Sequence, residues 1–553
     1  MKAKKRISIL LAFVLAIMAL TGCGSSGNDS DGASPTSQSN PSTVQPAGSD
    51  ASGKPPEQTN ISGPSKIINI ALNENLVQLD PHDQSNLPGY IVWTTCMEAL
   101  ILDDRMGNYE PLLAESWEHD SEGLVWTFKL RKGIKFHNGE DFNAADVQCT
   151  FDRLLSRRNE LQSSIEHWTL LEKCETIDDY TVQFTFSEPN SMALIAFSCT
   201  PIIPDEAYAE HGDDLFHKQL MYGTGPWIFQ EWQDGQFTHF IKNEEYWDKA
   251  NYDSYYDELY IRHLTELSTA IAAHLAGDIQ VNLKTGGIDE DLLSLYEGTE
   301  SRINMINVES GMYNYIGLQC SEDSVFHDID VRRAFEYCVD REAILNEILG
   351  GAGKVPVSII NDTCVGFDAS MPPYTYDPEQ AKELLANSSY DGRKLTIVSN
   401  TSTKKAEETL LAISENMNAV GFNTDILITE PSTMLDMRRS GNYDLFYVGN
   451  MHNGGDPCQV LNLRILNDAH KSHYVNDELN ALIEKIKVEM DTTKRNDYIK
   501  QCQWIMREEA APHSAIVQMN LIEPFDHGVT GIDLFRDGNF RIKYVTYDPA
   551  LVP

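Results

Sequence analysis

The sequence is poor in positive charge. Lys and Arg total 43 against 83 Asp and Glu, and the formal net charge is −40 at pH 7. Binding to nucleic acid and adhesion to anionic lipid both depend on Lys and Arg side chains. The composition therefore argues against nucleic acid as a partner and against attachment to a membrane by charge. It favours cationic ligands, although most of the acidic side chains are expected to be solvated.

Motifs for catalysis and metal binding are also missing. Neither G-x-S-x-G nor H-E-x-x-H occurs, and these patterns mark common hydrolases. "GGAGK" at 350–354 resembles a phosphate loop but lacks Gly at 348 and Ser or Thr at 355, so it is interpreted as a helix end. We expect no catalytic residue, no cofactor and no metal. An exported hydrolase stays an alternative, because catalytic groups can be distant in sequence.

Cysteines are few and lie far apart. There are ten, with no C-x-x-C pair. If Cys23 is modified as argued below, nine remain, and an odd number leaves at least one thiol free. Cys149 and Cys338 lie on apolar helical faces, where free Cys acts as a small hydrophobic residue. No particular disulfide is predicted.

The first 22 residues have the three parts of an export signal. A basic stretch (2–6) precedes the apolar run 7–20, and the small residues Thr21 and Gly22 follow before Cys23. The run is shorter than the ~20 residues that a helix needs to cross a bilayer, which favours a signal peptide. Leu-Thr-Gly-Cys at 20–23 resembles the lipobox of bacterial lipoproteins, in which the Cys receives a diacylglyceryl group and becomes the new N-terminus. An ordinary signal peptide is the alternative.

A polar stretch separates this signal from the rest of the chain. Residues 23–64 contain almost no large apolar side chain before Ile61, so they cannot bury enough surface to fold. We expect a flexible linker. Removing residues 1–22 removes four basic and no acidic side chains, which changes the charge from −40 to −44. The remaining 65–553 is too long for one core, and two or three subdomains are expected.

Periodic patterns predict alternating helices and strands in this body. Strands are expected at 65–73, 180–189, 313–318 and 515–519, and a strand, turn and strand at 124–139. Helices are expected after Asn143 and after Asp377-Pro378, before Gly421, and as one segment from Val331 to Ile348 that Gly350 closes. This order is typical of an α/β fold.

Several segments, in order, resemble the family 5 substrate-binding proteins of ABC importers, the peptide and nickel group. The longest is 108–155, "NYEPLLAESWEHDSEGLVWTFKLRKGIKFHNGEDFNAADVQCTFDRLL". Others are "QLDPHD" (78–83), "GTGPW" (223–227), "KNEEYWD" (242–248), "HLAGDIQV" (274–281) and "DIDVRRAFEYCVDREAIL" (328–345). The resemblance spans essentially the whole body.

The resemblance implies a two-lobed, periplasmic-binding-protein-like α/β fold with an extra subdomain inserted in lobe I. After a signal peptide (1–22) and the lipidated Cys23 with its linker (23–64), lobe I would comprise 65–95, 222–305 and 520–553, the inserted subdomain 96–221, and lobe II 306–519. Glycines 223 and 225 would allow a sharp turn and a close approach to another surface.

The resemblance also implies a function. Such proteins capture a small solute between lobes and deliver it to a membrane permease that is driven by separate ATPase subunits. The lipid on Cys23 would hold this chain, expected to be a monomer, at the extracytoplasmic face of the cell membrane. A signalling receptor with the same fold is an alternative that the sequence cannot separate from import.

A peptide is the commonest cargo of this family. The resemblance implies that, in peptide-binding members, an Asp shortly before an acidic residue followed by Pro accepts a hydrogen bond from the α-ammonium of the peptide. In the corresponding loop of this chain, Asn453 stands at the place of that Asp, before Asp456-Pro457. A nickel chelate, a modified amino acid or an oligosaccharide therefore remains open, and a shifted alignment would leave Asp456 as the anchor. The candidate ligand-binding residues are Tyr90, Tyr222, Thr224, Met451, His452, Asn453 and Asp456.

Overall fold

The computed structural model describes residues 66–83, 86–284, 286–288, 290–452 and 455–553. All of them belong to one compact unit, Gly63–Pro553. The predicted signal peptide, the linker, Cys23 and Asn453 lie outside the described residues. None of the helices within the described ranges is both long and apolar enough to span a bilayer.

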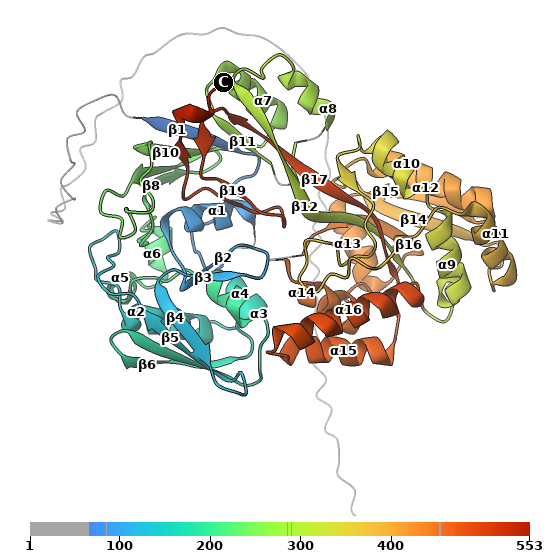
Figure 1. Ribbon diagram of the computed structural model, residues 1–553, viewed down its shortest axis with the longest axis horizontal. Coiled ribbons are helices and arrows are strands. Elements are labelled where there is room, and N and C mark those ends of the chain that lie inside the picture. The colour runs from blue at the N-terminus through green and yellow to red at the C-terminus, as the bar shows by residue number, and fades with distance from the viewer. Residues whose placement is uncertain (1–65, 84–85, 285, 289, 453–454) are drawn as a thin grey trace, which may run out of the picture. The chain divides into compact units, whose positions relative to one another are not determined.

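Two long antiparallel strands, β12 (Ile303–Leu318) and β17 (His513–Asp526), join the two halves of the body. They pair from Ile303–Asp526 to Gly317–His513, with a register shift between Glu309 and Tyr313. Figure 1 shows them running side by side from the half that carries β1 to the half that carries β14 and β16. We call the first half lobe I and the second lobe II.

In lobe I, a mixed sheet in the order β17-β11-β1-β10-β9-β8 extends from this pair. Its core includes Ile68, Ile70, Trp227 and Phe240, all at most 1% exposed. The elements are β1 (Ile67–Leu72), β8 (Trp227–Gln233), β9 (Phe237–Lys242), β10 (Glu258–His263), β11 (Val281–Leu283), α1 (Leu87–Cys96), α7 (Leu267–Ala276) and α8 (Glu290–Leu293), and the short C-terminal strands β18 (Val529–Thr530), β19 (Asp533–Leu534), β20 (Phe540–Arg541) and β21 (Thr546–Tyr547).

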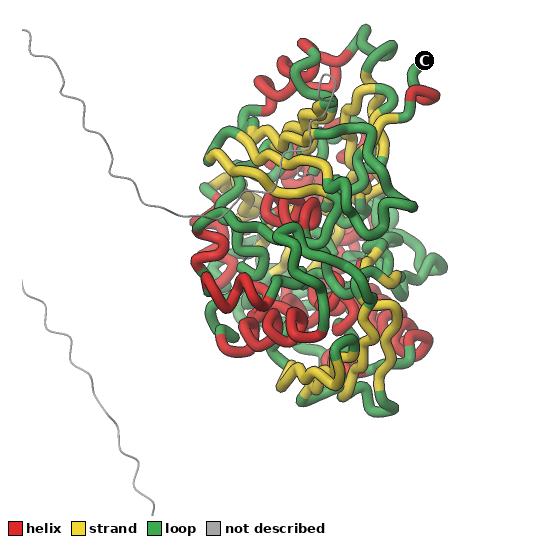
Figure 2. The backbone as a smooth tube through the Cα atoms, turned by 90° about the vertical axis from the view of Figure 1, so that its left-hand side faces the viewer, coloured by secondary structure: helices red, strands yellow, loops and turns green. Residues whose placement is uncertain are grey.

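A separate antiparallel sheet, β4-β5-β7-β6, forms the inserted subdomain around an aromatic core. In side view, the strands gather in separate groups with helices between them (Figure 2). The elements of the inserted subdomain are β2 (Ile101–Asp103), β3 (Tyr109–Pro111), β4 (Ala114–His119), β5 (Val125–Leu130), β6 (Leu171–Asp178), β7 (Thr181–Phe186), α2 (Ala144–Ser156), α3 (Gln162–His167) and α4 (Ala193–Ser198). The following α5 (Asp205–His211) and α6 (Asp214–His217) pack on the lobe I core through Ala207, Leu215 and Phe216.

Lobe II is a sheet in the order β15-β14-β16-β12-β17 with a hydrophobic core on each face. Successive strand residues such as Ile397 and Val398 point to opposite cores, as strand geometry requires. Its elements are α9 (Ile329–Cys338), α10 (Arg341–Ala343), β13 (Gly353–Lys354), α11 (Pro378–Asn387), β14 (Lys394–Asn400), α12 (Ala406–Val420), β15 (Asn423–Thr429), α13 (Pro431–Ser440), β16 (Leu445–Asn450), α14 (Cys458–Leu461), α15 (Asp477–Val488) and α16 (Thr492–Glu508).

Local signals in the sequence account for most helix ends. Asn143 accepts from the backbone N–H of Ala145, and Asp146 accepts from that of Asn143, which forms the predicted cap of α2. Asp377 caps α11 by accepting from Gln380, and Gly421 ends α12 with a φ of 114°. These predictions are confirmed.

Two predictions are wrong in detail. The expected single helix from Val331 to Ile348 ends at Cys338, because Asp340 caps a new helical turn by accepting from the N–H of Ala343. The expected second strand before Gly139 is also missing. There the chain folds back within five residues, and Phe136 donates to the carbonyl of Glu140.

The cysteines form no disulfide in the described part of the chain. Nine are free, and all but Cys149 and Cys199 are buried. Burial raises the pKa of every one of these thiols above its ordinary value. They therefore stay protonated and pack as small hydrophobic groups.

The turn with glycines 223 and 225 makes the predicted close approach. A Cβ at Gly223 would lie 2.0 Å from the carbonyl oxygen of Cys96, and one at Gly225 would lie 2.9 Å from it. The backbone of this turn therefore lies directly against the C-terminus of α1, and Gly225 donates to the Cys96 oxygen at 3.0 Å.

Candidate functional site

The loop after β16 meets the middle of β12, where the two lobes join. Asn450 donates to the hydroxyl of Tyr313 at 2.6 Å. The ring of His452 stacks on the same Tyr313, with centroids 5.3 Å apart, and its Nε2 donates to the carbonyl of Ile359 at 2.6 Å. Burial lowers the pKa of His452 to about 4, so the ring is neutral at pH 7. These contacts anchor the loop to the hinge strands.

The carboxylate of Asp456 is held on both oxygens. It accepts two hydrogen bonds from Arg495 of α16, at 2.7 and 2.9 Å, and one from the N–H of Cys458 at 2.8 Å, where α14 begins. Burial alone would lower the pKa of Arg495, but the charge of Asp456 outweighs it and raises that pKa above the ordinary value. Asp456 is therefore the carboxylate of a buried ion pair.

A cavity of about 520 Å³ lies between the inserted subdomain and lobe II. This volume is within the range of small-molecule sites. The subdomain contributes Gly107, Tyr109, Trp117, Glu118, His119, Trp126, Ser191 and Leu194, and lobe II contributes Val365, Asp456, Glu489, Met490, Thr492, Arg495 and Asn496.

The two walls of this cavity touch at Ser191. Its N–H donates to the carbonyl of Lys487 at 3.0 Å, and its hydroxyl donates to the carbonyl of Ile486 at 2.9 Å. The next residue, Met192, places its sulfur 3.6 Å from a guanidinium nitrogen of Arg495. The subdomain and the end of α15 are thus joined beside the cavity, which gives the aromatic wall a fixed position opposite lobe II.

Tyr90 lies at a second meeting point of the lobes. It belongs to α1, packs edge-on against Trp93 at 5.3 Å and faces the guanidinium of Arg105 at 4.8 Å. Arg105 is buried and pairs with Asp103 and Asp537. A Cβ at Gly455 would lie 2.8 Å from the carbonyl oxygen of Arg105. The structure therefore brings Tyr90, through Arg105, against the loop that carries Asp456.

Met451 reaches the C-terminal segment of lobe I. A Cβ placed on Gly538 would lie 3.9 Å from the Met451 methyl group and 3.3 Å from the sulfur of Met312. Met451 is half-buried there. Met451, His452 and Asp456 thus occupy one loop that contacts lobe I, and among the described residues of that loop only Asp456 lines the cavity.

Thr224 and Tyr222 lie elsewhere. The Thr224 hydroxyl donates to the buried carboxylate of Glu98 at 2.9 Å, and Glu98 also accepts from Lys543 at 2.7 Å. Tyr222 packs, half-buried, against the lobe I core. Neither residue lines the cavity. Both are held by lobe I alone, and Thr224 belongs to an internal hydrogen-bond network.

Sequence reasoning missed Arg495 and the aromatic wall. Trp117 and Trp126 lie on β4 and β5 within the segment interpreted only as a fold signature. The one available signal was that Trp117 and His119 alternate with the polar Ser116 and Glu118 on a short, mostly exposed strand. Arg495 follows an ordinary helix cap at Asp491 and carried no signal.

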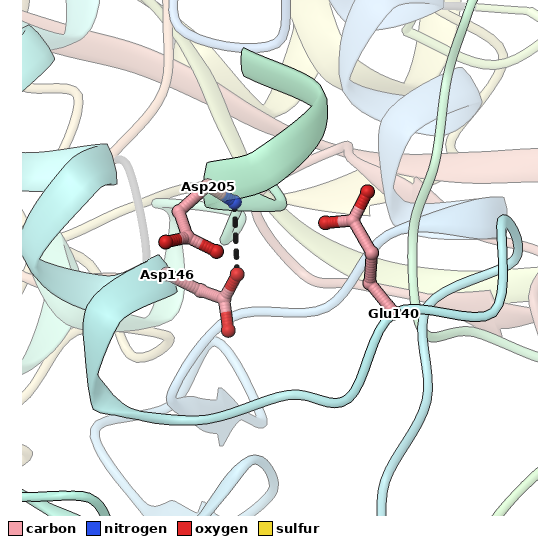
Figure 3. A group of neighbouring side chains, drawn as sticks. All are labelled: Glu140, Asp146 and Asp205. Carbon is pink, nitrogen blue, oxygen red and sulfur yellow. Dashed lines mark hydrogen bonds between the residues drawn. The ribbon is translucent and has the colours of Figure 1, made fainter. Parts of the chain in front are cut away.

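Three carboxylates gather at the start of α2, which Figure 3 shows. Asp146 is 1% exposed and accepts from the N–H of Asn143 and of Asp205, at 2.8 and 2.9 Å. Burial, and secondarily the charge of Asp205, raise the pKa of Asp146 to about 7. Both oxygens of Asp146 already serve the backbone, so the group is explained as a helix-capping arrangement with Glu140 beside it.

The chain was compared with known proteins. Residues 108–470 match the family model described as bacterial extracellular solute-binding proteins, family 5, middle region. The di/tripeptide-binding protein 1 of Pseudomonas aeruginosa (strain UCBPP-PA14) is 26% identical over 448 residues, covering 75% of this chain and 81% of that protein. The glutathione-binding protein GsiB of Salmonella choleraesuis (strain SC-B67) is 24% identical over 491 residues, covering 86% and 93%.

The fold has solved counterparts. HbpA2 from Haemophilus parasuis superposes with a TM-score of 0.76 at 22% identity, over 87% of this chain and 100% of that one. The likeness concerns the fold alone. It confirms the predicted α/β architecture with two lobes.

Proposed function

Because the chain belongs to family 5 of the bacterial extracellular solute-binding proteins, we propose that it captures a peptide or peptide-like solute between its lobes and is held to the membrane by a lipid on Cys23. The family match confirms the resemblance drawn from the sequence. Family 5 proteins work outside the cytoplasm, bind peptides or related solutes and deliver them to ABC permeases. The family model and the curated relatives describe solute-binding proteins, which also confirms that the chain is not an enzyme.

The cavity between the inserted subdomain and lobe II is the observation that carries the proposed capture. Its volume of about 520 Å³ suits a short peptide or a part of a longer one. Its two walls come from the two sides of the hinge strands, so a solute that contacts both walls stabilises the arrangement in which they face each other. The names of the di/tripeptide- and glutathione-binding relatives support a peptide-like solute.

The sequence at residue 453 supports a second cargo class. Peptide-binding members of the family are expected to carry Asp at this place, whereas this chain has Asn. The neighbouring Asp456 is paired with Arg495 on both oxygens, so it does not replace the missing anchor. A solute without a free α-ammonium, such as a blocked peptide, a metal chelate or an oligosaccharide, is therefore the alternative, and a receptor role on the same fold stays open.

Native mass spectrometry of the purified chain, followed by thermal-shift titration, tests the cargo. A co-purifying peptide mass, and a rise in melting temperature with short peptides, are expected. Peptides with a free and with an acetylated N-terminus should act alike if Asn453 replaces the carboxylate anchor. A melting temperature that rises only with sugars or metal chelates would refute the peptide assignment.

The lipid anchor is tested separately. Cys23→Ala should release the protein from the membrane fraction and abolish incorporation of labelled palmitate, whereas Cys149→Ala should leave both unchanged. With a formal net charge of −40, the chain is not expected to adhere to the membrane by charge, so the lipid would provide the attachment. The linker would keep the folded body at high local concentration near its permease. We expect the permease to be encoded together with ATPase subunits. Membrane association that persists in Cys23→Ala would contradict the anchor.

A further inference from the structure

The cavity between the inserted subdomain and lobe II carries an unbalanced negative charge. Arg495 is the only Lys or Arg among the described residues that line it, and its charge is cancelled by Asp456. Glu118 and Glu489 remain, and neither forms an ion pair within the described ranges. Glu118 is exposed at the rim and Glu489 is half-buried. A cation that enters the cavity therefore meets two carboxylates with no competing side-chain partner.

The same cavity has an aromatic wall. Tyr109, Trp117 and Trp126 line it from three strands of the subdomain. The half-buried Trp117 stacks on Phe128 with ring centroids 6.2 Å apart, whereas Trp126 is 3% exposed and packs between His119 at 4.8 Å and Phe197 at 6.1 Å, so Trp117 offers the more accessible face. No guanidinium or ammonium of the described residues lies over these three rings. Aromatic faces attract cations, and more strongly when water is partly excluded.

These two features select the same chemistry. Carboxylates at the rim favour an ammonium or guanidinium through charge, and the aromatic wall accommodates its aliphatic or planar stem. An anionic group would face like charges with Arg495 already occupied. We propose that this cavity is a specificity pocket for a cationic group of the cargo, such as the side chain of a Lys or Arg residue in a short peptide. This inference rests on the proposed capture of a peptide-like solute and adds that the bound solute carries a positively charged group.

A matched series of tripeptides tests the pocket. The probes are Ala-Lys-Ala, Ala-Arg-Ala, Ala-norleucine-Ala and Ala-Glu-Ala, titrated calorimetrically into the full chain at low ionic strength. The cationic peptides should bind about tenfold more tightly than the norleucine peptide, as expected from one half-exposed ion pair and one cation–π contact. The Glu peptide should bind most weakly, and added salt should reduce the difference.

Variants identify the carboxylates responsible. Glu118→Gln and Glu489→Gln should each reduce the preference for Lys over norleucine, and the double variant should abolish it, with norleucine binding unchanged as the internal check on folding. Glu115→Gln, an exposed carboxylate on the same strand β4 that does not line the cavity, is the control and should keep the preference.

The outcomes separate this inference from the proposed function. Equal binding of the Lys and norleucine peptides, or a preference that persists in the double variant, would overturn the pocket while leaving peptide capture intact. Failure of all four peptides to bind would overturn both.

Discussion

Asp456 and Arg495 bind each other through two hydrogen bonds, of 2.7 and 2.9 Å, across 39 residues of sequence, and both side chains are 9% exposed. Removing one partner leaves a buried charge unpaired, which costs about 3–5 kcal/mol. We expect Arg495→Met to lower the free energy of unfolding by about this amount in urea titrations. The double variant Asp456→Asn with Arg495→Met should recover part of the loss, and two simply additive losses would contradict the pairing.

The turn at Gly223 tolerates no side chain. A Cβ there would lie 2.0 Å from the Cys96 carbonyl oxygen, so Gly223→Ala forces the end of α1 and this turn apart. We expect a loss of about 3 kcal/mol in the free energy of unfolding, measured by thermal and chemical denaturation. Gly235→Asn is the control, because Gly235 has open space around it and a φ of 66°, which Asn adopts readily. Equal stability of the two variants would refute the close approach.

Asp146 makes stability depend on pH near neutrality. Its pKa is raised from 3.8 to about 7, mainly by burial and further by Asp205. The folded state holds this proton more tightly than the unfolded chain, so the stabilisation is complete below pH 3.8 and is lost as the pH rises through about 7. Asp205→Asn removes the neighbouring charge, and its melting temperature should fall less between about pH 5 and pH 8 than that of the natural chain.

The exposed carboxylate of Asp214 provides the control for this measurement. Asp214→Asn should reproduce the pH dependence of the natural chain, because Asp214 begins α6 at the surface. Identical slopes for Asp205→Asn and Asp214→Asn would show that the carboxyl groups of Asp146 and Asp205 are not coupled.

The lowered pKa of His452 makes stability depend on pH in the opposite direction to Asp146. Burial lowers its pKa from 6.5 to about 4, so the stability it permits is present above pH 6.5 and is lost as the pH falls through about 4. His452→Phe keeps a ring against Tyr313 but leaves the Ile359 carbonyl unpaired, which should cost about 1–3 kcal/mol at pH 7. In His452→Phe, the acid-induced loss of structure, monitored by circular dichroism, should depend less steeply on pH than in the natural chain. The exposed His217→Gln should leave the acid limb unchanged, and an unchanged limb in His452→Phe would contradict the prediction.

Local structure was predictable where one residue type determines the backbone. Asn143 and Asp377 cap helices as their side chains require, and Gly421 ends α12 because it adopts a left-handed conformation. The break at Asp340 was missed because the apolar stripe continues through it, and only the side-chain contact with Ala343 reveals a new helix start.

The candidate site was predictable only in part. The loop after β16 was found because its sequence resembles that of a known family, and the structure places Met451, His452 and Asp456 on it. The opposite wall of the cavity comes from strands more than 300 residues away in sequence. No periodicity or spacing connects Trp117 to Arg495, since their proximity depends on how the inserted subdomain packs against lobe II.

The nine free thiols, seven of them buried, have a consequence for how the molecule is made. With every described Cys free and its pKa raised by burial, residues 66–553, as far as the structure describes them, contain no cross-link that an oxidant must install and few thiolates that could exchange. Maturation outside the cytoplasm is therefore independent of disulfide-forming enzymes, and protein folded under reducing or oxidising conditions should be the same product.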